Sequence, residues 1–165
     1  MENRKQIITA EVAAKKLRRM ALQVVEQNHT EKQIVLIGIK AHGTVIAKKI
    51  SEFLKEVFTG EVLVLEITID KKDPLKIELD NKFDFNGKTV IIVDDVANSG
   101  RTMLYALKPL LEQYPKKIQT MALVERTHKT FPVDVDYVGL SVSTGADEHI
   151  TVEVEKGEIL GAWMS

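Results

Sequence analysis

The 165-residue sequence contains no cysteine, few aromatic residues (5%) and a formal net charge of only −1. The absence of cysteine excludes disulfides, thiolate metal ligands and cysteine nucleophiles. Near-neutrality means that any nucleic-acid surface would have to be a local basic patch. No apolar run approaches the ~20 residues of a membrane-spanning helix, and the N-terminal segment lacks the apolar core of a signal peptide. We therefore expect one cytoplasmic domain over residues 1–165, without a membrane partner.

Apolar residues make up 44% of the sequence, and their spacing alternates between the periods of helices and strands. Three predicted strands are almost continuously apolar, which is typical of strands buried on both faces of a parallel sheet. The pattern predicts an α/β domain with a doubly wound, mainly parallel sheet. The predicted strands are 33–38, 61–69, 89–94, 116–126, 135–142 and 149–156, and the predicted helices are 10–28, most of 41–58, and 101–114.

Each predicted helix carries an apolar face that should pack on this sheet. Thr9 is placed to cap the first helix, because its hydroxyl can accept from a free N–H of the first turn. Helical periodicity places Val12, Val57 and Leu111 on the buried faces of the first, second and third helices.

In a doubly wound sheet, ligands bind beyond the carboxyl ends of the strands, so the loops to inspect are 38–44, 70–76, 94–102 and 126–132. One of these loops begins with two adjacent carboxylates, Asp94 and Asp95. A lone buried carboxylate is costly. Acids at a strand end can instead accept hydrogen bonds from vicinal sugar hydroxyls or take part in a Mg²⁺ site. The alternative is a solvated turn that begins with aspartate.

A segment of small residues follows the two acids and runs into a helix. Gly100 lets the main chain approach a ligand closely, Ser99 and Thr102 add hydroxyl donors, and Arg101 adds charge. Free N–H groups at the start of a helix favour a phosphate. Taken by itself, this segment is equally consistent with a helix cap that binds nothing.

Three kinds of protein place aspartate at the end of an apolar strand. A P-loop ATPase also needs GxxxxGK[ST], which is absent here, and a response-regulator receiver has its acidic pair after the first strand rather than past the midpoint. An apolar strand, two acids and a run ending in [ST]-G-[KR]-[ST] resembles the phosphoribosyl pyrophosphate (PRPP) motif of type I phosphoribosyltransferases. The resemblance is greatest to the bifunctional pyrimidine-operon regulator and uracil phosphoribosyltransferase group, and it extends over "RRMALQVVEQN", "VLIGIKAHG", "LEITIDKKD" and "LVERTHKTFPVDVDYVGLSVST".

The resemblance implies a type I phosphoribosyltransferase fold with a small hood and a role for each loop. Asp94 and Asp95 would hold the ribose hydroxyls and, partly through PRPP and water, a Mg²⁺ ion, with Lys40 and Lys71 as further catalytic residues. A closing 70–76 loop would exclude water. The other implied contacts are those to the 5′-phosphate (Ala97, Asn98, Ser99, Gly100, Arg101, Thr102), to pyrophosphate (Ile39, Lys40, Ala41, His42, Gly43) and to the base (Val124, Glu125, Arg126, Val142).

The sequence also departs from the family pattern. Ala41 and His42 stand where the family usually has threonine and arginine, and Asp70-Lys71 replaces a Tyr-Arg pair. Purine enzymes of this fold carry aspartate at the position of Asn98, and asparagine cannot transfer a proton. The resemblance therefore favours transfer to uracil, which gives UMP and releases pyrophosphate. The alternatives are a nucleotide-sensing RNA-binding regulator of pyrimidine genes with weak or no catalysis, and salvage of hypoxanthine or guanine.

The first predicted helix carries the basic run Lys15, Lys16, Arg18 and Arg19. In the resembled family, basic surface binds messenger RNA, so these residues are candidates for such a contact. The alternative is the solvated face of an amphipathic helix. The family also implies a homodimer or homotetramer.

Overall fold

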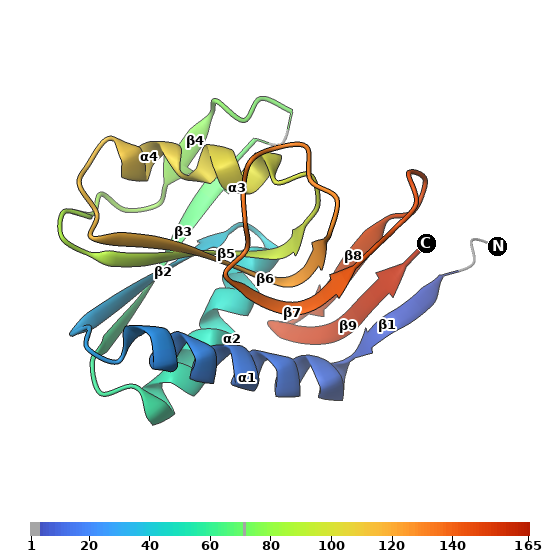
Figure 1. Cartoon of the computed structure of the whole chain (residues 1–165), viewed down its shortest axis with the longest axis horizontal. Coiled ribbons are helices and arrows are strands. Elements are labelled where there is room, and N and C mark those ends of the chain that lie inside the picture. The colour runs from blue at the N-terminus through green and yellow to red at the C-terminus, as the bar shows by residue number, and fades with distance from the viewer. Residues whose placement is uncertain (1–3, 71) are drawn as a thin grey trace.

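The computed structural model describes residues 4–70 and 72–165, whose strands form two sheets (Figure 1). The larger sheet has six strands in the order β4-β3-β2-β5-β6-β7, and the smaller has three in the order β1-β9-β8. The elements are β1 (Lys5–Thr9), α1 (Ala10–Asn28), β2 (Gln33–Ile39), α2 (His42–Val57), β3 (Glu61–Ile69), β4 (Ile77–Leu79), β5 (Thr89–Ala97), α3 (Arg101–Ala106), α4 (Lys108–Leu111), β6 (Lys117–Arg126), β7 (Tyr137–Val142), β8 (Ile150–Glu155) and β9 (Glu158–Met164).

Neighbouring strands of the larger sheet are parallel, except that the short edge strand β4 pairs antiparallel with β3. Residues 34–39 of β2 and 90–93 of β5 are fully buried at the centre, as their continuous apolar character predicts. All six predicted strands are present, and the one predicted at 149–156 corresponds to β8 of the smaller sheet. The mainly parallel sheet is therefore confirmed.

Different helices cover the two faces of the larger sheet (Figure 1). On one face, Leu17 of α1 and Ile50 of α2 share a buried apolar cluster with Leu36 of β2. On the other face, Met103 of α3 joins a second cluster around Ile37 of β2. Successive residues of β2 thus pack into the apolar clusters on opposite faces of the sheet, which is the alternation expected of a strand with both faces covered. This arrangement confirms the predicted doubly wound fold.

The smaller sheet is antiparallel and joins segments from both ends of the described chain (Figure 1). It corresponds to the small hood that the family resemblance implies. Its strands β1 and β9 were not predicted, because β1 has only five residues and Gly161 interrupts the apolar alternation of β9. Gly161 has a φ of 146°, and a Cβ there would lie 2.4 Å from the carbonyl oxygen of Ile8, so the close pairing of these strands needs glycine.

Helix α1 begins as the sequence predicts. Thr9 is its cap, and the N–H of Val12 donates to Thr9 Oγ1 at 3.2 Å. Although α1 has 19 residues, it is apolar on its buried face alone, and its charged side chains lie outside that face. Within residues 4–70 and 72–165, none of the helices is both long and apolar enough to cross a membrane.

The third predicted helix is wrong in its extent, and three predicted core positions are wrong. The segment 101–114 is divided at Leu107 into α3 and α4, because Pro109 near the start of α4 has no N–H with which to continue the earlier helix. Leu111 is 69% exposed, Val12 39% and Val57 40%. All three lie in terminal turns of their helices, where neighbouring elements leave them open to solvent.

Candidate functional site

Two of the four predicted loops meet at the carboxyl ends of β2 and β5. These strands are parallel neighbours in which Gly38 pairs with Val93, so the 38–44 loop and the 94–102 loop leave the sheet side by side. Gly43 lies directly against β5. A Cβ at this position would lie 2.5 Å from the carbonyl oxygen of Val93 and 3.1 Å from the Cα of Asp94. The absence of a side chain at Gly43 therefore lets the two loops touch.

The two aspartates lie on the strand and not after it. β5 was predicted to end at Asp94 but continues to Ala97, because it keeps pairing with β6 as far as Glu125. Asp94 is 7% exposed and the side chain of Asp95 is 18% exposed. The N–H of Asp95 donates to Asp94 Oδ1 at 2.9 Å, and the N–H of Val96 donates to Asp95 Oδ1 at 2.8 Å. Both carboxylates are thus held by main-chain donors at the edge of the site.

The residues after the acids surround a pocket of about 210 Å³. Gly100 has a φ of 85°, a left-handed conformation that turns the chain into α3. The carbonyl of Ser99 accepts from the N–H groups of Thr130 and Phe131, which fixes the turn to the 126–132 loop. The pocket is lined by Asp94, Val96, Ala97, Asn98, Ser99, Gly100, Arg101, Thr102 and Met103. The structure therefore brings all six predicted 5′-phosphate residues to one pocket.

Several polar groups of this pocket are available to a ligand. Within residues 4–70 and 72–165, the side chains of Asn98, Arg101 and Thr102 make no hydrogen bond or ion pair. The hydroxyl of Ser99 accepts weakly from the N–H of Arg101, at 3.3 Å. An amide, a guanidinium and two hydroxyls around a small pocket form a set of donors suited to a phosphate.

His42 joins the two loops through a side-chain contact. Its Nδ1 lies 3.2 Å from Oδ2 of Asp95. A residue predicted to contact pyrophosphate thus touches a residue predicted to contact ribose. The imidazole is 42% exposed, so it faces solvent on one side and the acid on the other.

Lys40 is directed away from the two acids of β5. Its Nζ lies 2.6 Å from Asp80 Oδ2 and 3.3 Å from Glu66 Oε2. Hydrogen bonds to Asp80 and then to Glu66 raise the pKa of Lys40 above its ordinary value, so the ammonium stays charged. Lys40 is joined to Ala41 by a cis peptide bond. Lys71, the other predicted catalytic lysine, lies outside the described residues.

The predicted base segment lies at the end of β6, beside β7. Val124 is fully buried in the apolar core, so only its main chain is available to a ligand. Glu125 accepts from Lys129 at 2.9 Å and from Ser141 at 3.0 Å. Arg126 donates to the carbonyl of Gly145 at 2.8 Å. The carbonyl of Val142 accepts from the N–H of Thr127, and Val142 is the register partner of Arg126, so the four predicted residues lie together at the ends of β6 and β7.

Sequence reasoning missed Glu66, Asp80 and Thr44. The two acids pair with Lys40, and Thr44 has a buried hydroxyl without a hydrogen-bond partner among the described residues. Glu66 lies in the stretch "LEITIDKKD" that resembles the family, but no motif marks Asp80 or Thr44. Asp80 follows β4, a three-residue edge strand that carries little sequence signal.

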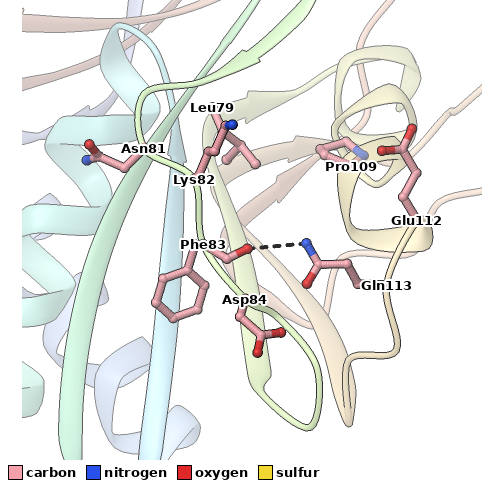
Figure 2. Close-up of a pocket in the computed structure, with 8 residues that line it drawn as sticks. All are labelled: Leu79, Asn81, Lys82, Phe83, Asp84, Pro109, Glu112 and Gln113. Atoms are coloured by element: carbon pink, nitrogen blue, oxygen red, sulfur yellow. Dashed lines mark hydrogen bonds between the residues drawn. The ribbon is translucent and has the colours of Figure 1, made fainter.

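A larger pocket of about 520 Å³ lies between α4 and the segment that follows β4 (Figure 2). Gln113 closes one side of it, and its Nε2 donates to the carbonyl of Phe83 at 3.2 Å. The other lining residues are Leu79, Asn81, Lys82, Asp84, Pro109 and Glu112. None of the predicted site residues lines this pocket, which separates it from the loops at the carboxyl ends of β2 and β5.

A doubly wound sheet with an acidic strand end, a small pocket lined by hydrogen-bond donors and a second loop pressed against it defines the type I phosphoribosyltransferase class. The sequence model described as "Phosphoribosyl transferase domain" matches residues 3–156. The chain belongs to the phosphoribosyltransferase family, as the motif at Asp94–Thr102 predicts.

Within this family, the chain is similar to the bifunctional pyrimidine regulators. It is 37% identical to "Bifunctional protein PyrR" of Ligilactobacillus salivarius, an alignment that covers 92% of each chain. It is 34% identical to "Pyrimidine operon regulatory protein" of Lactococcus lactis, over 93% of this chain and 91% of the relative. The predicted resemblance to this group is confirmed.

Solved structures show the same fold. A hypoxanthine-guanine phosphoribosyltransferase of Bacillus anthracis aligns with a TM-score of 0.75 over 96% of both chains, at 22% identity. A hypoxanthine phosphoribosyltransferase of Trypanosoma cruzi, in complex with the product IMP, aligns with a TM-score of 0.74 over 84% of this chain and 76% of its own, at 19% identity. At such low identity the likeness concerns the fold and not the base.

Proposed function

We propose that this phosphoribosyltransferase binds PRPP and transfers its phosphoribosyl group to uracil, which forms UMP and releases pyrophosphate. The observation that carries the proposal is the junction of the 38–44 and 94–102 loops, where Gly43 lies against Asp94. PRPP has a 5′-phosphate, two ribose hydroxyls and a diphosphate. The pocket at 97–102, the acids Asp94 and Asp95, and the 38–44 loop form three adjacent regions with matching chemistry.

In this proposal the residues of the 97–102 pocket hold the 5′-phosphate, and the two acids accept hydrogen bonds from the ribose hydroxyls. The charge-assisted bonds from Arg101 would be the strongest on the phosphate side. In the 38–44 loop, the main chain of 39–43, together with Lys40 and His42, would face the diphosphate. Lys71, in the loop predicted to close over the site, is proposed as a further cation.

A Mg²⁺ ion fits the chemistry of Asp94 and Asp95, because this cation prefers carboxylate oxygens and keeps several other ligands. Among the described residues, no cluster of three or more His, Asp or Glu side chains is placed to hold a metal. We propose that the protein binds Mg²⁺ jointly with PRPP oxygens and water. When bound, the ion neutralises charge on the diphosphate.

The reaction we propose is displacement of pyrophosphate at the anomeric carbon through an oxocarbenium-like transition state. The protein contributes mainly by positioning: the phosphate pocket and the acids hold the sugar, while the edge at 124–126 and 142 holds the base. Because charge moves from the bond being broken to the diphosphate, cations of the 38–44 loop stabilise the departing group. Closure of the 70–76 loop would keep water from the anomeric carbon.

Uracil is the proposed base for two reasons. The relatives at 32–37% identity include proteins named bifunctional PyrR and pyrimidine operon regulatory protein. In addition, Asn98 lines the pocket with a side chain that makes no bond to the described residues, where purine enzymes of this fold have a proton-transferring aspartate. The purine neighbours among solved structures share less than 25% identity and do not bear on this choice.

A base panel tests the proposal. The protein is incubated with PRPP, Mg²⁺ and one of uracil, hypoxanthine or guanine, and nucleotide formation is followed by chromatography. We expect UMP from uracil. Product from hypoxanthine or guanine without UMP would overturn the pyrimidine assignment.

A second candidate function is the binding of a pyrimidine-operon leader RNA, which the regulatory names of the relatives favour. The structure shows which side chains of the basic run on α1 are already bonded within the protein. Lys16 and Arg19 donate to the carbonyls of Val138 and Gly139, whereas Lys15 pairs with Glu11 of its own helix. Arg18 has no such partner among the described residues. Half of the run is therefore engaged with β7, which limits the basic surface.

RNA binding is tested by titrating a leader RNA at several salt concentrations. A regulator would bind with an affinity that falls steeply as salt rises, because phosphate contacts release counterions. Tight, salt-dependent binding without turnover of any base would favour the regulator over the enzyme. We also propose a homodimer or homotetramer, which sedimentation velocity would establish.

A further inference from the structure

The ammonium of Lys40 belongs to a cluster of four charged side chains beside β3. Besides the contacts to Asp80 and Glu66, Lys48 of α2 lies 3.6 Å from Glu66 Oε1. The positive charges of two lysines therefore equal the negative charges of two acids in this cluster. Their side chains are 27–62% exposed, so solvent reaches the cluster and the pairs can exchange.

The strand order explains why Lys40 points to this cluster. β2 lies between β3 and β5, and the N–H of Lys40 still donates to the carbonyl of Ile67 on β3, at 3.0 Å. In the register of these strands, Glu66 pairs with Gly38, two residues before Lys40. The N–H of Asp80 donates to the carbonyl of Glu66 at 3.2 Å, which places both acids on one side of Lys40.

The main chain of the same loop lies at the other side, against β5. Three residues after Lys40, Gly43 is packed on Val93 and Asp94 so closely that a Cβ would lie 2.5 Å from the Val93 carbonyl oxygen. Lys40 is thus attached to a loop that borders the acids, while its charge is held on the far side of β2. An ammonium on a flexible four-carbon stem can exchange one set of anionic oxygens for another.

We propose that Asp80 and Glu66 are positioning residues that hold Lys40 back from the diphosphate of PRPP and thereby limit the affinity of the site. This inference rests on the proposed function, in which the 38–44 loop faces the diphosphate. Binding exchanges the two carboxylates for diphosphate oxygens. Because the carboxylates already hold the ammonium, the net gain from Lys40 on binding is reduced by the strength of those pairs.

The expected effect is small but measurable. Partly exposed ion pairs of this kind change an equilibrium by about two- to five-fold. Asp80→Asn removes the shorter contact to Lys40, and Glu66→Gln removes the longer one. We expect both substitutions to tighten PRPP binding, with the larger change for Asp80→Asn.

Isothermal titration with PRPP and Mg²⁺ tests the inference. The Kd for PRPP should fall about two- to five-fold in Asp80→Asn relative to the unmodified protein. Glu158→Gln is the matched control, because Glu158 also pairs with a lysine of α2, Lys49 at 2.8 Å, but lies on β9. It should leave the Kd unchanged. Thermal unfolding shows whether each variant is folded. If Asp80→Asn does not fold, the Kd of Glu66→Gln is the test.

A double-mutant cycle separates this role from a structural one. In a Lys40→Ala background, Asp80→Asn should no longer tighten binding, because the acid acts through the lysine. A gain that persists without Lys40, or an unchanged or weaker affinity in both acid variants while the unmodified protein binds PRPP, would overturn the inference and leave the proposed function intact. Failure of the unmodified protein and all variants to bind PRPP would overturn both.

Discussion

The 94–102 loop and the 38–44 loop leave neighbouring strands at the same edge of the sheet, yet their polar groups are arranged in opposite ways. Around the first loop, the side chains of Asn98, Arg101 and Thr102 have no partner among the described residues. In the second, Lys40 is paired with two acids and His42 with Asp95. The first loop can accept an anion without giving up a protein contact, whereas the second must exchange one.

This difference bears on how strongly each loop can hold an anion. A pocket of unpaired donors binds an anion with the full strength of its hydrogen bonds, less the cost of desolvation. A loop with paired charges gains only the difference between the new pairs and the old ones. We infer that the 94–102 loop anchors PRPP and that the 38–44 loop sets how tightly the diphosphate end is held.

Removing both acids should have the largest effect. In the double variant Asp94→Asn and Asp95→Asn, PRPP affinity should fall about 100-fold or more, since each charge-assisted hydrogen bond contributes about 1.5–3 kcal/mol. The amide oxygens can still accept from the N–H groups of Asp95 and Val96, so the fold should survive. Titration calorimetry measures the affinity and circular dichroism checks the fold. Unchanged PRPP affinity would contradict the site assignment.

The two loops depend on glycine for different reasons, and this too can be tested. Gly43→Ala puts a methyl group 2.5 Å from a main-chain carbonyl, so it should push the loops apart, cost about 1–3 kcal/mol of stability and weaken PRPP binding at least about tenfold. Gly100→Ala forces a side chain into a left-handed conformation, which costs about 1–2 kcal/mol.

Thermal unfolding and PRPP titration compare these variants. Gly145→Ala is the matched control, because the added Cβ would meet Glu148 at an ordinary 3.5 Å. If Gly43→Ala proved as mild as Gly145→Ala in both measurements, the close contact between the loops would not matter for the site.

Restoring the family's arginine in the 38–44 loop should have a smaller effect of opposite sign. His42→Arg supplies a permanent charge and a bidentate donor, so the Kd for PRPP should fall about three- to tenfold. His29→Arg adds the same charge at the C-cap of α1 and serves as the control. Equal changes in both variants would show that the gain comes from net charge and not from the loop.

The smallest expected effect concerns Asp70, at the start of the 70–76 loop. The N–H groups of Lys72 and Asp73 both donate to its Oδ1, and these bonds lower its pKa below the ordinary value of 3.8. Because the folded-state pKa is lowered, the turn gains stability from the carboxylate above pH 3.8 and loses it as the pH falls through the lowered pKa.

Amide proton shifts of Lys72 and Asp73, followed by NMR between pH 6 and pH 2, should show this transition. A midpoint at or above 3.8 would contradict the lowered pKa. In Asp70→Asn the transition of the Lys72 amide that follows the Asp70 carboxyl should be lost.

Much of the fold was predictable from local pattern. β2, β5 and β6 are continuous apolar runs of a length that fits strands, and the Asp94–Thr102 motif identifies the family without any tertiary information. The predictions that were wrong or missing concern a proline inside a helix and short elements at the edge of the fold. Pro109 divides a segment whose apolar spacing is helical both before and after it. Leu111 is the last residue of α4, and its side chain is exposed there. Short edge elements such as β4 have too few residues to produce a pattern.

The sequence by itself determined the class of fold, the family and the residues that line the 97–102 pocket, because these depend on period, length and a contiguous motif. The tertiary structure decided which charges are paired. Lys40 meets Asp80, forty residues later, and His42 meets Asp95 across two neighbouring strands. Such contacts depend on strand order and register, which no stretch of sequence specifies. In the folded protein, the basic residues Lys40 and His42 of the 38–44 loop are therefore already paired with acids.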